Sequence, residues 1–167
     1  MKNGKNILII NTGGTFNKIY NPLNGYLEIY KKNSAIKKIL ATSKINDTKV
    51  VGMIYKDSLD ITNKDRKKLA KYINNSKYNK ILIVHGTDTI NNTASYLANK
   101  IEDKQIVLTG SMIPFSIDPI EATANLILGY GFLTECKKND IYIAMHGLVK
   151  NHKEIKKNRK LGIFECQ

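Results

Sequence analysis

The sequence contains little cysteine, and its cysteines do not form a metal-binding motif. Cys136 and Cys166 are the only two among 167 residues, and neither lies in a CxxC pair. The three histidines, His85, His146 and His152, add no zinc-ligand spacing to them. We therefore expect reduced thiols, and we expect the protein to need neither a metal nor another cofactor.

The sequence also lacks a hydrophobic run long enough to cross a membrane. A spanning helix needs about 18 or more consecutive apolar residues, and no run in the chain approaches that length. The opening residues, MKNGKNILII, lead directly into a strand pattern and lack the small-residue cleavage site of a signal peptide. We expect a cytoplasmic protein that does not contact a membrane.

Acidic residues are scarce relative to basic ones. The chain has 14 Asp and Glu against 27 Lys and Arg, which gives a formal net charge of +13. Such an excess is typical of nucleic-acid-binding proteins, whose binding depends steeply on salt. However, the lysines are spread over segments such as DRKKLAKYINNSKYNK, and no stacking aromatics or base-reading motif accompany even the densest run, KNHKEIKKNRK. We therefore do not expect a nucleic-acid partner.

What the sequence does contain is an alternation of strand and helix patterns. Near-continuous apolar runs, typical of parallel strands that are covered on both faces, lie at 6–12, 49–55, 80–86, 105–111 and 141–147. Helix patterns lie between them, at 33–42, 62–76, 90–101 and 119–134. Two of the helix starts are specific, because Thr62 and Asp65 fit a capping box and Asp118 fits an N-cap before Pro119.

This alternation predicts the fold class. Strands joined by helices through right-handed crossovers form an open, mostly parallel, twisted α/β sheet with helices on both faces. Three-layer Rossmann-like and flavodoxin-like folds have this architecture. No internal repeat or low-complexity linker divides the chain, so residues 1–167 are predicted to form a single domain.

Small or polar residues follow every predicted strand. In an open α/β sheet the ligand crevice lies outside the carboxyl ends of the strands. The five strand ends are therefore expected to converge on one edge of the sheet and to form the binding site there. They are the segments 11–15, 56–58, 85–88, 109–111 and 146–147.

The strand end HGTDT, residues 85–89, carries more polar groups than helix capping requires. Either Asp88 or Thr89 would serve as the N-cap of the following helix. Thr87 is then left over, and a hydroxyl beside a carboxylate can act as a nucleophile or a proton relay when a base is near. Gly13 and Gly14 also follow a strand, but the phosphate-binding patterns GxGxxG and GxxxxGK[ST] are missing, so a nucleotide is not favoured.

Four segments, in order along the chain, resemble the bacterial-type L-asparaginases. They are NTGGTF at 11–16, KDSLDIT at 56–62, HGTDTI at 85–90, and VLTGSMIP at 107–114 followed by EATANL. The resemblance covers nearly the whole chain and corresponds to the amino-terminal domain of that family. The carboxy-terminal domain of its full-length members has no counterpart here, so the short single-domain asparaginase-like proteins resemble this sequence best. Leu59 and Ile113 depart from residues that many members carry.

The resemblance implies roles for the threonines and for a lysine. Thr15 would be the nucleophile that attacks a side-chain amide, and Thr87 would be a second hydroxyl backed by a lysine. An ungapped comparison selects Lys157 as that lysine, with Lys156 as the neighbouring alternative. Asp88 would take part in catalysis beside Thr87.

The resemblance also implies the substrate contacts and an activating tyrosine. Asp88 and Ser58 would hold the amino-acid part of the substrate, while Gly14 and Gly86 would contribute backbone N–H groups, which stabilise a developing oxyanion. A tyrosine on the mobile loop after the first strand would activate the nucleophile. Tyr20 and Tyr26 both fit this position.

Taken together, the resemblance implies an asparaginase-like amidohydrolase. It would hydrolyse asparagine or a related small amide through an acyl-enzyme, without a cofactor, and it would assemble as a homodimer or a larger homo-oligomer. The alternative is a non-catalytic amino-acid-binding or sensor domain that retains the same pocket.

Overall fold

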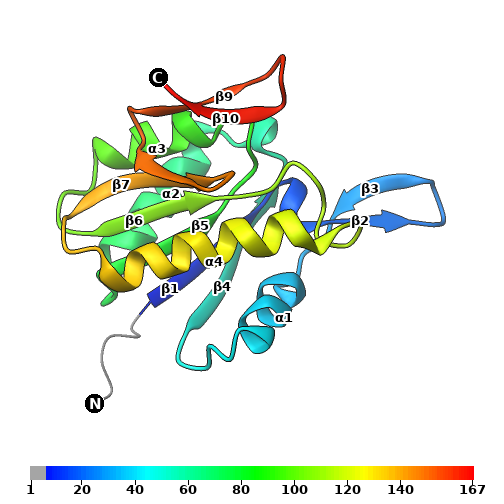
Figure 1. Cartoon of the computed structure of the whole chain (residues 1–167), viewed down its shortest axis with the longest axis horizontal. Coiled ribbons are helices and arrows are strands. Elements are labelled where there is room, and N and C mark those ends of the chain that lie inside the picture. The colour runs from blue at the N-terminus through cyan, green and yellow to red at the C-terminus, as the bar shows by residue number, and fades with distance from the viewer. Residues whose placement is uncertain (1–6) are drawn as a thin grey trace.

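A six-stranded sheet forms the middle layer of the molecule, which the computed structural model describes over residues 7–167 (Figure 1). Its strands, in spatial order, are β4 (Lys49–Lys56), β1 (Ile7–Gly13), β5 (Lys80–Val84), β6 (Gln105–Thr109), β7 (Asp140–Met145) and β8 (Leu148–Asn151). The first five are parallel, and β8 runs antiparallel to β7. The five predicted strands are confirmed, although residue 6 of the first lies outside the described residues. Strand β8 was not predicted.

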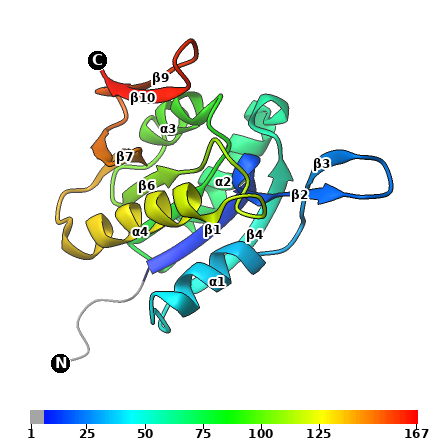
Figure 2. The ribbon, with the colours of Figure 1, turned by 45° about the vertical axis from the view of Figure 1, so that its right-hand side comes forward.

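Four helices cover the two faces of this sheet, as predicted. They are α1 (Ser34–Thr42), α2 (Asn63–Asn74), α3 (Ile90–Ala98) and α4 (Pro119–Glu135). Alternate residues of β1 point to opposite faces, so Leu8 packs in one buried cluster with α2 and α3, and Ile9 packs in the other with α1 and α4. The chain therefore has the predicted α/β fold in three layers (Figure 2).

The two predicted helix starts are confirmed. Thr62 and Asp65 form a capping box at the start of α2, and the Asp118 side chain accepts a hydrogen bond from Ile120 N–H at 2.9 Å, before Pro119 in α4. No helix within residues 7–167 is both long enough and apolar enough to cross a membrane.

Two hairpins lie outside the six-stranded sheet, and neither was predicted. Strands β2 (Lys18–Asn21) and β3 (Tyr26–Ile29) pair with each other and project from one side of the molecule (Figure 2). The segment that was expected to be a loop after the first strand is this hairpin. Strands β9 (Ile155–Asn158) and β10 (Ile163–Cys166) form the second, which lies beside α3 (Figures 1 and 2). Each of these strands has only four residues, too few to show a clear strand periodicity.

Helix α4 packs closely against the sheet at Gly129. A Cβ atom added there would lie 2.9 Å from Leu82 Cδ1 and 3.1 Å from Val107 Cγ1. Gly131 belongs to the same helix but is exposed, and a Cβ atom added there would meet no other atom within 4 Å. Both glycines lie in α4, but only Gly129 packs against the sheet.

We predict opposite effects of alanine at these two positions. Gly131→Ala is expected to raise the free energy of unfolding by about 0.5–1 kcal/mol, because alanine favours a helix more than glycine does. Gly129→Ala is expected to lower it by about 1–2 kcal/mol, because overpacking against the sheet outweighs that gain. Urea unfolding of both variants measures the difference. Equal stabilisation by the two substitutions would contradict the close approach of α4.

Candidate active site

Glycine backbones bring three neighbouring strand ends together at one edge of the sheet. Gly14 follows β1 with a φ angle of 73°, and a Cβ atom added there would lie 2.5 Å from Gly86 Cα. A Cβ atom added at Gly86, after β5, would lie 2.6 Å from Ser58 Cβ. Any side chain at either position would force these backbones apart. Thr15 and Thr87, the residues that follow the two glycines, therefore stand at adjoining corners.

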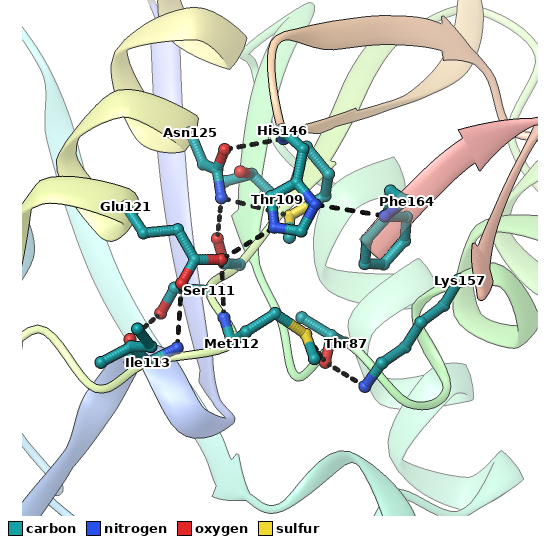
Figure 3. A network of polar contacts seen from close by, with 12 residues as sticks. Thr87, Thr109, Ser111, Met112, Ile113, Glu121, Asn125, His146, Lys157 and Phe164 are labelled. Carbon is teal, nitrogen blue, oxygen red and sulfur yellow. Dashed lines mark hydrogen bonds and ion pairs between the residues drawn. The ribbon is translucent and has the colours of Figure 1, made fainter. Parts of the chain in front are cut away.

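A lysine holds the hydroxyl of Thr87. Lys157 Nζ donates a hydrogen bond to Thr87 Oγ1 at 2.9 Å (Figure 3). It also donates to Asp88 Oδ1 at 2.9 Å. Thr87 is 5% exposed and the Lys157 side chain is 12% exposed, whereas the Asp88 side chain is 32% exposed, so the lysine is largely out of solvent and its carboxylate partner is partly in it. The Thr87 hydroxyl in turn donates to Met112 Sδ at 3.3 Å. Thr87 thus has both a nitrogen and a sulfur partner.

The unpredicted hairpin β9–β10 carries this lysine. Lys157 pairs with Phe164 across the hairpin, and Asn91 of α3 donates a hydrogen bond to Ile155 O at 2.7 Å. Successive side chains of a strand point to opposite faces. Lys156 is accordingly exposed, while Lys157 reaches the strand ends. The structure brings Lys157, and not Lys156, to Thr87.

Thr15 lies in a short 3-10 turn, Thr15–Asn17, directly after β1. It is half-buried, and within residues 7–167 its hydroxyl has no hydrogen-bond partner. Tyr20 and Tyr26 lie on the β2–β3 hairpin and are 59% and 70% exposed. In the described part of the chain neither tyrosine hydrogen-bonds to Thr15. The structure therefore does not join either tyrosine to the other site residues.

The N-cap position of α3 is Thr89, one of the two expected residues, but three groups near the strand ends have other partners than expected. Thr89 occupies the N-cap position of α3 but caps no amide with its side chain, because its hydroxyl donates to Ser58 O at 2.7 Å. Asp88 precedes the N-cap position, and its carboxylate accepts from Lys157 Nζ. The N–H group of Gly14 donates to Lys56 O at 2.9 Å, so it is not free for an oxyanion.

The buried side chain of His85 holds the backbone of Gly86 in place, a role that the sequence did not reveal. Arg66 Nε donates to Thr93 Oγ1 at 3.0 Å, so the Thr93 hydroxyl is left to donate to His85 Nε2 at 2.9 Å. The Nδ1 atom of His85 therefore carries the proton and donates to Gly86 O at 2.8 Å. Burial of this ring, which is 0% exposed, lowers the pKa of His85 to about 4. His85 is thus neutral and fixes the peptide that precedes Thr87.

The site is built from hydroxyl, carboxylate and amine groups. No cluster of three or more His, Cys, Asp or Glu side chains that could hold a metal ion occurs within residues 7–167. Hydroxyls that lie beside a lysine and a carboxylate are groups that nucleophilic and proton-transfer chemistry uses.

Residues 6–163 of the sequence match the family described as the asparaginase amino-terminal domain. No curated protein sequence shows a significant match.

Solved asparaginases share the fold. The thermostable L-asparaginase from Thermococcus kodakarensis is 26% identical with a TM-score of 0.81, and the match covers 96% of this chain and 50% of that one. L-asparaginase I from Vibrio cholerae is 23% identical with a TM-score of 0.80, covering 98% and 52%. A probable cytoplasmic L-asparaginase from Campylobacter jejuni is 23% identical with a TM-score of 0.79, covering 98% and 53%. The chain thus spans about half the length of these three proteins.

We predict that His85 makes the stability of the protein depend on pH in a defined window. The pKa of His85 is about 4 in the folded protein and about 6.5 in the unfolded chain, so acid favours the unfolded chain. The contribution is fully present above about pH 6.5 and is lost as the pH falls toward about 4, by roughly 3 kcal/mol in total. Unfolding of wild type and His85→Gln between pH 4.5 and 7 measures it. Parallel stability curves for the two proteins would refute the prediction.

Proposed function

Because the chain belongs to the asparaginase amino-terminal domain family, we propose that it hydrolyses the side-chain amide of asparagine or of a related small amide. The observation that carries this proposal is the placement of Lys157 Nζ, 2.9 Å from both Thr87 Oγ1 and Asp88 Oδ1, beside the corner that presents Thr15. No cofactor takes part in the reaction, and Thr15 is the nucleophile.

The reaction proceeds in two steps. In the first, Thr15 Oγ1 attacks the amide carbon, the C–N bond breaks, and ammonia leaves with the threonine proton. Thr15 then carries the acyl group as an ester. In the second step, water attacks this ester, the bond to Thr15 Oγ1 breaks, and the carboxylic acid leaves.

Thr87 and Lys157 move the proton in this scheme. A threonine hydroxyl and a water molecule are both poor nucleophiles, so each step needs a group that accepts a proton. The Thr87 hydroxyl, which accepts a hydrogen bond from Lys157 Nζ, takes the proton of the attacking water in the second step and passes it to the lysine. Asp88 and Ser58 hold the amino-acid part of the substrate, and Gly86 lies at the corner between them.

The tyrosines enter the scheme from the hairpin. Tyr20 and Tyr26 are both exposed on β2–β3, which begins three residues after Thr15. Movement of this hairpin toward the sheet edge would bring one of them to the Thr15 hydroxyl. Either tyrosine then takes the proton of the nucleophile.

In this proposal a single domain carries the reaction. The chain assembles in the cytoplasm as a homodimer or a larger homo-oligomer. Large apolar side chains are exposed on the segments that follow β4 and β6, since Leu59 is 65% exposed, Ile117 60% and Ile113 43%. Leu59 follows Ser58 directly, and Ile113 follows Met112. A second copy of the chain is the proposed cover for these side chains.

A sensor domain that binds an amino acid without hydrolysis is the second candidate. One observation favours it, namely that the Thr15 hydroxyl has no proton acceptor at hydrogen-bond distance within residues 7–167. In that case the pocket would bind asparagine or aspartate and release no ammonia.

We predict that the two threonines are each required for turnover. Thr15→Ala removes the nucleophile and Thr87→Ala removes the relay, so each is expected to lower kcat for amide hydrolysis by about 100-fold or more. Ammonia release from asparagine, glutamine and related amides measures kcat, and calorimetry with aspartate measures binding. Full activity of Thr15→Ala would exclude the acyl-enzyme. Binding by the wild type without ammonia release would select the sensor.

The neighbouring lysines provide a matched pair. Lys157→Met is expected to lower kcat by about 100-fold or more, because it removes the proton acceptor that contacts Thr87. Lys156→Met removes the same charge from the exposed face of β9 and is expected to change kcat by less than about twofold. A larger loss in Lys156→Met than in Lys157→Met would reverse the assignment.

A further inference from the structure

The carboxylate of Glu121 binds the loop that follows β6. Glu121 lies in the first turn of α4, where an acidic side chain is normally explained by the helix dipole. Here its two oxygens accept hydrogen bonds from consecutive backbone amides, Met112 N–H at 2.8 Å and Ile113 N–H at 2.9 Å. This bidentate contact fixes Met112, whose Sδ atom accepts the hydroxyl of Thr87 (Figure 3).

The imidazole of His146 joins this carboxylate to the hairpin β9–β10. Phe164 N–H of β10 donates to His146 Nδ1 at 3.1 Å, and His146 Nε2 lies 3.1 Å from Glu121 Oε1. Because Nδ1 accepts, Nε2 carries the proton and donates to the carboxylate. The Phe164 ring also packs edge-on against the imidazole, with ring centroids 5.8 Å apart. One neutral histidine thus satisfies both neighbours.

The backbone of His146 is itself held in an uncommon conformation. Its φ angle is 51°, in the left-handed region that most side chains avoid. The Asn125 amide stabilises this turn, because its Oδ1 accepts from His146 N–H at 3.0 Å and its Nδ2 donates to Gly110 O at 3.0 Å. Asn125 therefore ties His146, which follows β7, to Gly110, which follows β6, and this fixes the direction of the imidazole.

Two chains of contacts lead from this pair to the same hydroxyl. One runs from Glu121 through Met112 to Thr87. The other runs from His146 through Phe164 to its cross-strand partner Lys157, and from Lys157 Nζ to Thr87 (Figure 3). Because β9 and β10 pair only with each other among the strands of residues 7–167, the lysine depends on such side-chain contacts for its position.

We infer that His146 and Glu121 are a positioning pair that holds Lys157 and Met112 against Thr87. His146 sets the position of the lysine-bearing hairpin, and Glu121 sets the position of the thioether. Neither residue touches the reacting atoms. The consequence for catalysis rests on the proposed function, whereas the consequence for the placement of Lys157 does not.

The reactivity of Lys157 toward acetic anhydride tests this inference without any substrate. Lys156, on the exposed face of the same strand, serves as the internal reference, and mass spectrometry of the peptides gives the ratio of the two acetylation rates. His146→Gly deletes the ring and tolerates the left-handed backbone. It is expected to raise the Lys157 to Lys156 ratio several-fold.

His146→Asn is the conservative variant. Asparagine also tolerates the left-handed backbone, and its Oδ1 can accept Phe164 N–H as the imidazole does. The ratio in His146→Asn is therefore expected to return close to that of the wild type. An unchanged ratio in a folded His146→Gly, or an equal rise in both variants, would overturn the inference.

A second measurement applies to the wild type alone, should the glycine variant fail to fold. The ring nitrogen chemical shifts of His146 report which nitrogen carries the proton. The inference requires a proton on Nε2 and none on Nδ1, and it requires slow hydrogen exchange of the Phe164 amide. A proton on Nδ1 at neutral pH, or rapid exchange of that amide, would refute it.

Turnover, when the wild type shows it, provides a separate readout. His146→Gly is expected to lower kcat several-fold with a smaller change in KM, because it displaces the proton acceptor and leaves the residues proposed to bind substrate in place. His146→Asn is expected to restore most of kcat. Absence of turnover in the wild type would count against the proposed function, while the acetylation ratio would still decide the positioning role.

Discussion

The close contact of the Gly14 and Gly86 backbones with each other and of Gly86 with Ser58 is the constraint on which the rest of the site depends. The three residues follow β1, β5 and β4, which are neighbours in the sheet, and they approach to distances that exclude a Cβ atom on either glycine. This contact converts three separate strand ends into one surface. Thr15 and Thr87 owe their proximity to it, and no hydrogen bond between the two threonines is needed.

The basic group of the site has to come from outside the sheet. The ends of the parallel strands supply hydroxyls, a carboxylate and backbone amides, and the lysine reaches them from a separate hairpin. Ile155 and Phe164 anchor that hairpin, since both are buried in the cluster of α2 and α3. In the ion pair of Lys157 with Asp88 the lysine is 12% exposed and the carboxylate 32% exposed, and partial burial makes such a pair interact more strongly than one at the open surface. The His146–Glu121 pair adds a polar anchor on the opposite strand of the hairpin.

Local signals in the sequence predict the sheet, the helices and the strand-end site. Apolar runs mark the five parallel strands, and the pairs Thr62–Asp65 and Asp118–Pro119 mark helix starts because capping depends on adjacent residues. The hairpins β2–β3 and β9–β10 could not be predicted, because their strands of four residues gain stability from tertiary packing. For the same reason the choice of Lys157 came from family resemblance. The role of Glu121 depends on Met112, nine residues away in a loop, and no local pattern marks such a contact.

The central claim is that Thr15 becomes covalently acylated while the Thr87–Lys157 pair moves protons. The most direct test is mass spectrometry of the protein quenched in acid during turnover of asparagine, with Lys157→Met included to slow the hydrolysis of the ester. The account predicts one added aspartyl group on the peptide that contains Thr15, and none in Thr15→Ala. An aspartyl adduct on the peptide that contains Thr87 would contradict it. So would turnover by the wild type with no adduct in the wild type or in Lys157→Met.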